Sequence, residues 1–234
     1  MKKKIKIKVT AVLTAAGQST RMGGAESKVI RNICGKPVIF YSLAALQLCR
    51  SVDEIIIACR EPDIIYIGDI VKSFGISKVS RIIPGGDSRG RSVEKAVAEI
   101  DSQDGDFVLI HDAARPCVQP EDIDRLVQQA FRTGAAVLYI PSRDTLKKIE
   151  NGRIIGSADR ASIGRILTPQ CFNLKLFREA LKALASGTEF TDDSSIVQHM
   201  GKEIACVEGS SLNIKITVPE DLLLAEAILN LTLN

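Results

Sequence analysis

A segment near the start of the chain combines small residues with two separated positive charges. It begins with Ala15-Ala16-Gly17 and continues to Arg21 and Lys28. Small residues let the backbone approach a ligand closely with its N–H groups turned inward, and the two cations supply charge for phosphate oxygens. The segment is neither a Walker A loop nor a Gly-x-Gly-x-x-Gly motif. On composition alone it is either a polyphosphate-binding loop or a surface loop with two solvated cations.

A second polar loop, at residues 85–93, is rich in glycine and opens a segment with helical spacing. Its backbone N–H groups, together with Asp87 and Ser92, suit the polar edge of a nucleotide base. The alternative is a helix N-terminus with ordinary capping. Both interpretations stay open from these residues alone.

A third polar loop is His111-Asp112-Ala113-Ala114-Arg115-Pro116, which follows an apolar run. A carboxylate such as Asp112 directly after a buried strand suits a magnesium ion or a ligand hydroxyl, and Arg115 suits a phosphate group. The alternative is an Asp–Arg pair that caps the strand end. We interpret His111 as a structural histidine rather than a base.

The elements that carry these loops follow from an alternation of two patterns. Continuous apolar runs, typical of strands buried on both faces, cover residues 9–13, 54–59, 107–111 and 135–140. Helical spacing of apolar residues recurs between them, at residues 39–46, 93–100 and 123–130. The alternation predicts an α/β fold with a mostly parallel sheet and helices on both faces. In such sheets ligands bind at the carboxyl ends of the strands, which is where the polar loops lie.

Residues 141–160 are polar and interrupt this alternation. Asn151-Gly152 is a turn signal between two short segments that contain isoleucine, and this predicts a hairpin that protrudes from the domain. Such a β-arm needs a surface to pack against, which is either a partner subunit or the domain itself. An apolar helix, residues 222–231, is predicted after Pro219.

Composition bounds the class of protein. With 234 residues, a single domain over 1–234 is expected. A net charge of +3, 4% aromatic residues and no Trp argue against a nucleic-acid partner. The six cysteines form no Cys-x-x-Cys pair, which predicts buried thiols in a reducing cytoplasm. The lysines at residues 2–4 precede a strand rather than an export signal, and no apolar run reaches the roughly 18 to 20 residues of a membrane span.

An ordered set of motifs resembles the 2-C-methyl-D-erythritol 4-phosphate cytidylyltransferase family over nearly the whole chain. In order, these are Ala15-Ala16-Gly17 with Arg21-Met22 and Lys28, Gly85-Gly86-Asp87 with Ser92-Val93, His111 to Pro116, Asp144-Thr145 with Lys147, Asp159-Arg160, Leu167-Thr168-Pro169-Gln170 with Phe172, Thr191-Asp192, Asn213-Ile214-Lys215, and Pro219-Glu220-Asp221. Each motif is weak alone, and the ordered set is specific.

The resemblance implies a Rossmann-like nucleotidyltransferase fold whose β-arm joins a homodimer. It also implies cytidylyl transfer from CTP to 2-C-methyl-D-erythritol 4-phosphate in non-mevalonate isoprenoid biosynthesis, with a divalent cation such as Mg²⁺. The implied catalytic residues are Arg21, Lys28, Arg160 and Lys215. Those implied for CTP are Ala15, Ala16, Gly17, Gly86, Asp87 and Ser92, and those for the acceptor are Asp112, which also serves the metal, Arg115, Thr145, Thr168 and Thr191. Thr145 and Arg160 would come from the partner's arm.

Two departures and three alternatives accompany the resemblance. The family usually has proline before the loop lysine, whereas this chain has Ser27 before Lys28, and residues 30–34 are more polar than is usual in the family. The nearest alternative is a cytidylyltransferase for ribitol 5-phosphate, in which a Ser-Val type pair tends to replace Ala113-Ala114. A sugar-nucleotide pyrophosphorylase that uses UTP or GTP is more distant. A nucleotide-binding regulator without catalysis is the alternative from another class, and the joint presence of Arg21, Lys28, Asp112 and Lys215 argues against it.

Overall fold

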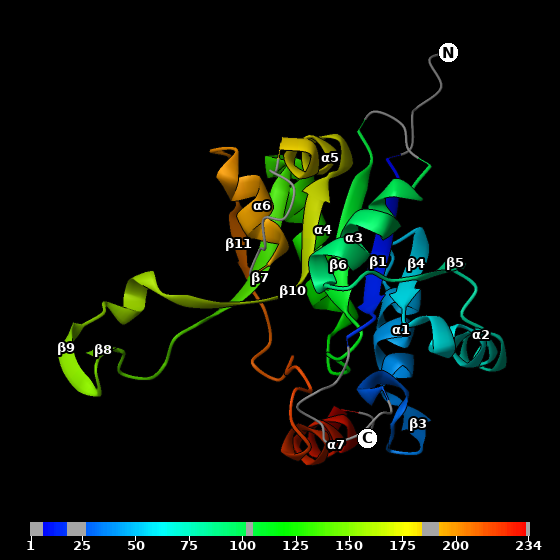
Figure 1. Cartoon of the computed structure of the whole chain (residues 1–234), viewed down its shortest axis with the longest axis horizontal. Helices are drawn as coiled ribbons and strands as arrows, with labels where there is room; N and C mark the ends of the chain where they lie inside the picture. Colours follow the sequence, from blue (N-terminus) through cyan, green and yellow to red (C-terminus); the bar gives the residue numbers. More distant parts are fainter. Residues whose placement is uncertain (1–6, 18–26, 102–104, 184–191, 233–234) are drawn as a thin grey trace.

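A mixed seven-stranded sheet forms the centre of the molecule, with strand order β11-β7-β10-β6-β1-β4-β5 (Figure 1). This computed structural model describes residues 7–17, 27–101, 105–183 and 192–232. The strands are β1 (Val9–Ala15), β4 (Glu54–Cys59), β5 (Val79–Pro84), β6 (Phe107–Asp112), β7 (Ala135–Pro141), β10 (Gly164–Asn173) and β11 (Ala205–Glu208). Neighbouring strands are parallel except where β10 pairs with β6 and β7. The predicted α/β class with a mostly parallel sheet is confirmed, and the antiparallel β10 was not predicted.

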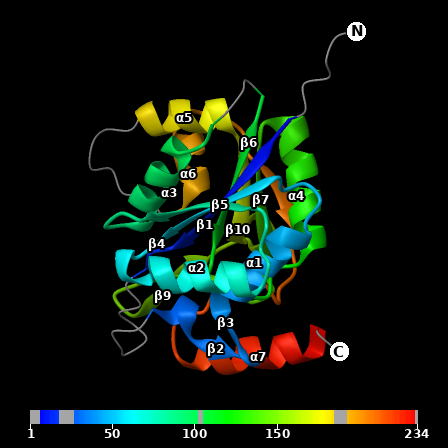
Figure 2. The same cartoon turned by 90° about the vertical axis from the view of Figure 1, so that its right-hand side faces the viewer.

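Helices cover both faces of the sheet, as Figure 2 shows. One layer holds α1 (Val38–Leu48), α2 (Ile64–Ser73) and α4 (Pro120–Thr133), and the other holds α3 (Arg89–Ala98), α5 (Leu174–Ala183) and α6 (Asp193–His199). Successive residues of a strand point to opposite faces, so Leu13 packs into the first layer and Val12 into the second. Both are fully buried, which is why the runs in the sequence are continuous rather than alternating.

A smaller layer lies below the sheet and packs against the segments that carry Lys28 and Lys215. Here α7 (Glu220–Thr232) packs near the two short strands β2 (Asn32–Ile33) and β3 (Lys36–Pro37) (Figure 2). Their cluster joins Ile33, Ile216 and Ile228. The 3₁₀ turn η2 (Lys28–Ile30) precedes β2, and η3 (Glu61–Asp63) precedes α2. The layer therefore anchors the segment that carries Lys28 and the segment that carries Lys215.

The β-arm is a two-stranded hairpin that projects away from the sheet (Figure 1). It pairs β8 (Lys147–Glu150) with β9 (Arg153–Ser157), and η4 (Arg160–Ser162) follows. Asn151 and Gly152 both have positive φ, 48° and 76°, as a two-residue hairpin turn of type I′ requires. The hairpin predicted from Asn151-Gly152 is therefore present. Ile149, Ile154 and Ile155 on it are exposed.

All six cysteines carry free thiols. Cys49, Cys59, Cys117 and Cys171 are buried, and burial raises the pKa of the first three to about 12. These thiols pack as small apolar groups. Across the described part of the chain, none of the helices is both long and apolar enough to cross a membrane.

Candidate active site

A cavity of about 300 Å³ opens at the carboxyl ends of β1 and β6. Its wall is built by the end of β1, the turn η2, the loop before α3, the end of β6 and the segment after β11. The lining residues are Thr14, Ala15, Ala16, Gly17, Lys28, Val29, Gly86, Asp87, Ser88, Arg89, Ser92, Asp112, Ala114, Lys215 and Thr217. All three polar loops of the sequence thus contribute to one cavity, whose size suits a small ligand.

The first and second loops approach each other so closely that glycine is required between them. A Cβ added to Gly85 would overlap the Cβ of Ala16 and come within 2.8 Å of the Ser92 hydroxyl. A Cβ on Gly86 would overlap the side chain of Arg91. The Ser92 hydroxyl holds the loop closed, because it accepts from the Gly86 N–H at 3.0 Å and donates to the Ser88 carbonyl at 2.9 Å.

The Asp112 carboxylate is surrounded by positive charge. Its Oδ1 accepts from Arg89 Nε at 2.8 Å, and its Oδ2 lies 2.7 Å from Lys215 Nζ and 3.6 Å from Arg115 Nε. The Thr14 hydroxyl donates to Oδ1 at 3.2 Å. Burial alone would raise the pKa of Asp112, but the charges of Arg89 and Lys215 outweigh burial and hold that pKa below its usual range. Asp112 is therefore ionised.

Two buried side chains fix Asp112 from behind. Its backbone N–H donates to Thr168 Oγ1 at 3.1 Å, and the same oxygen lies 3.0 Å from His111 Nδ1. His111 is fully buried, and burial lowers its pKa to about 3. It is neutral at neutral pH and does not line the cavity, in agreement with its interpretation as a structural histidine.

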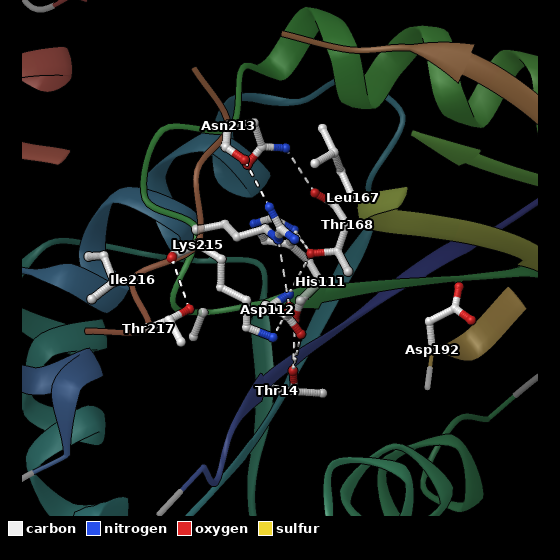
Figure 3. A network of polar contacts seen from close by, with 12 residues as sticks. Thr14, His111, Asp112, Leu167, Thr168, Asp192, Asn213, Lys215, Ile216 and Thr217 are labelled. Carbon is white, nitrogen blue, oxygen red and sulfur yellow. Dashed lines mark hydrogen bonds and ion pairs between the residues drawn. The ribbon is translucent and has the colours of Figure 1, made fainter. Parts of the chain in front are cut away.

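The segment that carries Lys215 is tied to the loop after β6 and to the middle of β10. Figure 3 shows Lys215 extending to Asp112 and Asn213 reaching Thr168. The Ile216 N–H donates to the Ala114 carbonyl at 2.8 Å, and Asn213 Nδ2 donates to the Thr168 carbonyl at 2.9 Å. These contacts fix the backbone on either side of Lys215.

Lys28 reaches this segment from the other end of the chain. Its Nζ donates to the Ile216 carbonyl at 2.7 Å. Lys28, Arg89 and Lys215 thus face the cavity together with two carboxylates, Asp87 and Asp112. Because Asp112 is already paired with Arg89 and Lys215, the excess positive charge suits an anionic ligand with phosphate groups.

Comparison with known proteins agrees with this geometry. The family model described as 2-C-methyl-D-erythritol 4-phosphate cytidylyltransferase matches residues 9–231, which include every residue of the cavity wall. The chain belongs to the 2-C-methyl-D-erythritol 4-phosphate cytidylyltransferase family. The match confirms the resemblance carried by the ordered motifs.

Individual members of the cytidylyltransferase family are similar over almost their full length. The protein of that name from Halalkalibacterium halodurans is 38% identical over 221 residues, which are 94% of this chain and 96% of the relative. The one from Clostridium botulinum strain Okra is 38% identical over 224 residues, 95% of this chain and 97% of the relative. The crystal structure of 4-diphosphocytidyl-2C-methyl-D-erythritol synthase from Anaerococcus prevotii has a TM-score of 0.84 at 29% identity, with 96% of each chain covered.

Most residues that the cytidylyltransferase resemblance assigned to the site line the cavity. They are Ala15, Ala16, Gly17, Lys28, Gly86, Asp87, Ser92, Asp112 and Lys215. Arg21 and Thr191 lie outside the described residues. The roles assigned to all of these residues stay predictions, since the cavity shows their placement and not their partners.

The other assigned residues lie elsewhere in the structure. Arg115 and Thr168 were predicted to contact the acceptor, but both are buried behind Asp112 rather than in the cavity wall. The guanidinium of Arg115 donates to the Asn213 carbonyl at 2.8 Å, so it holds the Lys215 segment in place. Thr145 and Arg160 are exposed on or beside the β-arm and do not line this cavity.

Sequence reasoning missed Arg89 and Asp193. Arg89 lines the cavity and bonds Asp112 at 2.8 Å, while its two terminal nitrogens bond Asp193 at 2.8 and 2.7 Å. Burial opposes ionisation of Arg89, but the charges of Asp193 and Asp112 outweigh it and raise its pKa. A hint in the sequence is that a basic residue begins α3, where the helix dipole disfavours positive charge.

The cavity offers few side-chain ligands for the predicted magnesium ion. Across the residues described, no group of three or more His, Cys, Asp or Glu side chains could hold a metal. Asp112 lines the cavity in its ionised form, yet its oxygens already bond Arg89 and Lys215. The described residues are compatible with an ion that takes most of its ligands from the phosphates of a bound nucleotide, with Asp112 as one carboxylate.

Proposed function

We propose that this chain transfers the cytidylyl group of CTP to 2-C-methyl-D-erythritol 4-phosphate. The products are 4-diphosphocytidyl-2-C-methyl-D-erythritol and pyrophosphate, and the reaction belongs to non-mevalonate isoprenoid biosynthesis. The proposal rests on one observation. Lys28, Asp112 and Lys215 line the same cavity in a chain whose relatives are named for this activity.

The reaction needs positioning and charge rather than a base. An acceptor phosphate oxygen attacks the α-phosphorus of CTP, and the bond from that phosphorus to the oxygen bridging to the β-phosphate breaks. Pyrophosphate leaves with the electron pair. A phosphate oxygen is already a nucleophile at neutral pH, and His111, the neutral histidine nearby, lies behind the wall. Alignment of the two anions and stabilisation of the developing charge therefore supply most of the rate.

The role of each residue follows from its position in the cavity wall. Lys28, with Arg21, stabilises charge on the α-phosphate. Gly86 and Asp87 bind cytosine across the narrow gap between the first two loops. Lys215 holds the attacking phosphate, and Asp112 orients Lys215 through the 2.7 Å ion pair. Asp112 would hold a Mg²⁺ ion that accompanies CTP, and the ion would offset the charge of the triphosphate.

We further propose that the β-arm joins two subunits and completes the acceptor site with the partner's Thr145 and Arg160. An isolated two-stranded hairpin is marginally stable, and the exposed fractions of Ile149, Ile154 and Ile155 are 69%, 67% and 59%. A partner subunit would cover this apolar surface. Free thiols support the prediction of a cytoplasmic location.

Subunit mixing tests the shared site. We expect Lys28→Ala and Arg160→Ala chains to be inactive alone. In an equal mixture half of the dimers are heterodimers, and each has one site with both residues intact, so about a quarter of the sites should recover. Exchanged heterodimers that stay inactive would show that the site is not shared.

A substrate panel tests the reaction itself. Pyrophosphate release is measured with CTP, UTP or GTP, each with 2-C-methyl-D-erythritol 4-phosphate or ribitol 5-phosphate. The proposal predicts release mainly with CTP and the methylerythritol acceptor. A preference for ribitol 5-phosphate would identify the sister cytidylyltransferase. A preference for UTP or GTP would identify a pyrophosphorylase, and the absence of pyrophosphate release with every pair would indicate a regulator.

A further inference from the structure

A row of alternating charges runs from α6 into the cavity. Asp193, at the start of α6, is held by both terminal nitrogens of Arg89 at 2.8 and 2.7 Å. Arg89 Nε bonds Asp112 Oδ1 at 2.8 Å, and Asp112 Oδ2 lies 2.7 Å from Lys215 Nζ. The row Asp193–Arg89–Asp112–Lys215 thus links a helix at the back of the site to the lysine that faces the ligand.

Asp193 is the member that does not line the cavity. Its side chain is 1% exposed, compared with 29% for Arg89 and 38% for Lys215. Burial raises the pKa of Asp193, and the charge and bonds of Arg89 act in the opposite direction. A buried ion pair contributes little to stability compared with apolar packing of the same volume, which makes a structural purpose alone a weak explanation.

The geometry of Arg89 explains what Asp193 does. A guanidinium is planar, and a carboxylate bonded to both of its terminal nitrogens fixes that plane. With the plane fixed, Nε points at Asp112 Oδ1, while the Thr14 hydroxyl occupies the same oxygen from another side. The carboxylate of Asp112 therefore cannot rotate freely, and its second oxygen stays directed at Lys215.

We propose that Asp193 is a positioning residue for Lys215 and acts through Arg89 and Asp112. This inference rests on the proposed function, in which Lys215 holds the phosphate of the acceptor. Loss of the Asp193 charge lets Arg89 turn, Asp112 follows, and Lys215 loses its fixed direction. Asp112 keeps its charge and its bond from Thr14 in this case, so a metal ion that accompanies CTP keeps its carboxylate and the binding of CTP by the loops around Gly17 and Gly86 changes little.

The first test is the isosteric substitution Asp193→Asn, with steady-state kinetics in both substrates. Networks of this kind change the coupling of a distant site by about tenfold, so we expect about a tenfold rise in the acceptor KM or fall in kcat. The KM for CTP should stay close to that of the unchanged chain. The matched control is Glu94→Gln, which removes a carboxylate paired with Arg91 on the exposed side of α3 and should change neither constant.

The decisive step repeats Asp193→Asn in a Lys215→Met background. If Asp193 acts only through Lys215, Asp193→Asn causes no further loss of kcat/KM for the acceptor once Lys215→Met is present. Equal losses in both backgrounds overturn the inference, and so does a parallel rise in the KM for CTP. If Asp193→Asn does not fold, the same comparison is made with Arg89→Lys, which keeps a cation but has no guanidinium plane for Asp193 to fix. An unchanged chain that is inactive with this acceptor overturns the proposed function instead, and the inference with it.

Discussion

Asp112→Asn removes the carboxylate that lies between Arg89, Arg115 and Lys215 and should affect stability as well as activity. In the folded protein Asp112 is 7% exposed and lies at 2.8 Å from Arg89 and 2.7 Å from Lys215. The substitution leaves Arg89, Lys215 and Arg115 facing a neutral amide. Arg89 keeps its pair with Asp193, but Lys215 and Arg115 lose the carboxylate beside them. The folded state therefore loses a stabilising interaction that the unfolded chain never had.

The size of the effect follows from the burial of each partner. Lys215 is 38% exposed, so solvent screens its contribution, whereas Arg89 is 29% exposed and bonds Asp112 directly. Removal of one partner of a buried ion pair costs about 3 to 5 kcal/mol, and we expect the lower end here. For a chain of this length 1 kcal/mol corresponds to about 2 to 4 °C in Tm. A fall of roughly 6 to 12 °C is therefore predicted.

The assay is thermal unfolding by circular dichroism at neutral pH, together with kcat for cytidylyl transfer. Asp101→Asn is the matched control, since Asp101 pairs with Arg81 at 3.0 Å but is 90% exposed, and it should change neither Tm nor kcat appreciably. A Tm of Asp112→Asn equal to that of the unchanged chain would refute the reasoning about burial and charge. The pKa of Asp112 is lowered in the folded state, so its contribution is present above the unfolded pKa of about 3.9 and is lost as the pH falls below it.

Three further predictions test other parts of the site. Lys28→Ala, and separately Arg21→Ala, should lower kcat by roughly 100-fold or more; unchanged kcat in both contradicts the assignment of the first loop. Gly85→Ala should raise the KM for CTP, because the added Cβ overlaps Ala16, while Gly90→Ala meets only a contact at 3.9 Å and should not; equal effects refute the argument. Burial lowers the pKa of His111 to about 3, from about 6.5 in the unfolded chain. The free energy of unfolding should therefore fall as the pH drops from about 6.5 toward 3, by up to about 1.4 kcal/mol per pH unit. In urea unfolding of His111→Gln, the free energy of unfolding should depend less steeply on pH than in the unchanged chain. The same pH dependence in both proteins would argue against the low pKa of His111.

The architecture was largely predictable because its signals are local. The runs at 54–59 and 135–140 became β4 and β7, and Asn151-Gly152 became the turn of the hairpin. The strand β10 was not predicted. Residues 164–173 include Arg165, Pro169 and Gln170 and form no continuous apolar run, and the strands that pair with β10 lie elsewhere in the sequence.

The site was predictable where its residues follow strands directly, as Gly17 and Asp112 do. The local pattern did not predict that Arg115 donates to the Asn213 carbonyl, because Asn213 lies 98 residues away in the sequence. Arg89 and Asp193 were missed for the same reason, since their ion pair spans 104 residues. Local patterns predict which loops face a ligand, whereas the partners that fix a charged side chain depend on the tertiary structure.

The fate of the α-phosphate tests the central claim most directly. CTP labelled at the α-phosphate is incubated with 2-C-methyl-D-erythritol 4-phosphate, Mg²⁺ and either the unchanged chain or Lys28→Ala. The account predicts that the label moves into 4-diphosphocytidyl-2-C-methyl-D-erythritol while unlabelled pyrophosphate is released, and that Lys28→Ala slows this transfer. Label that remains in CTP, or that appears as CMP without the coupled product, would contradict it.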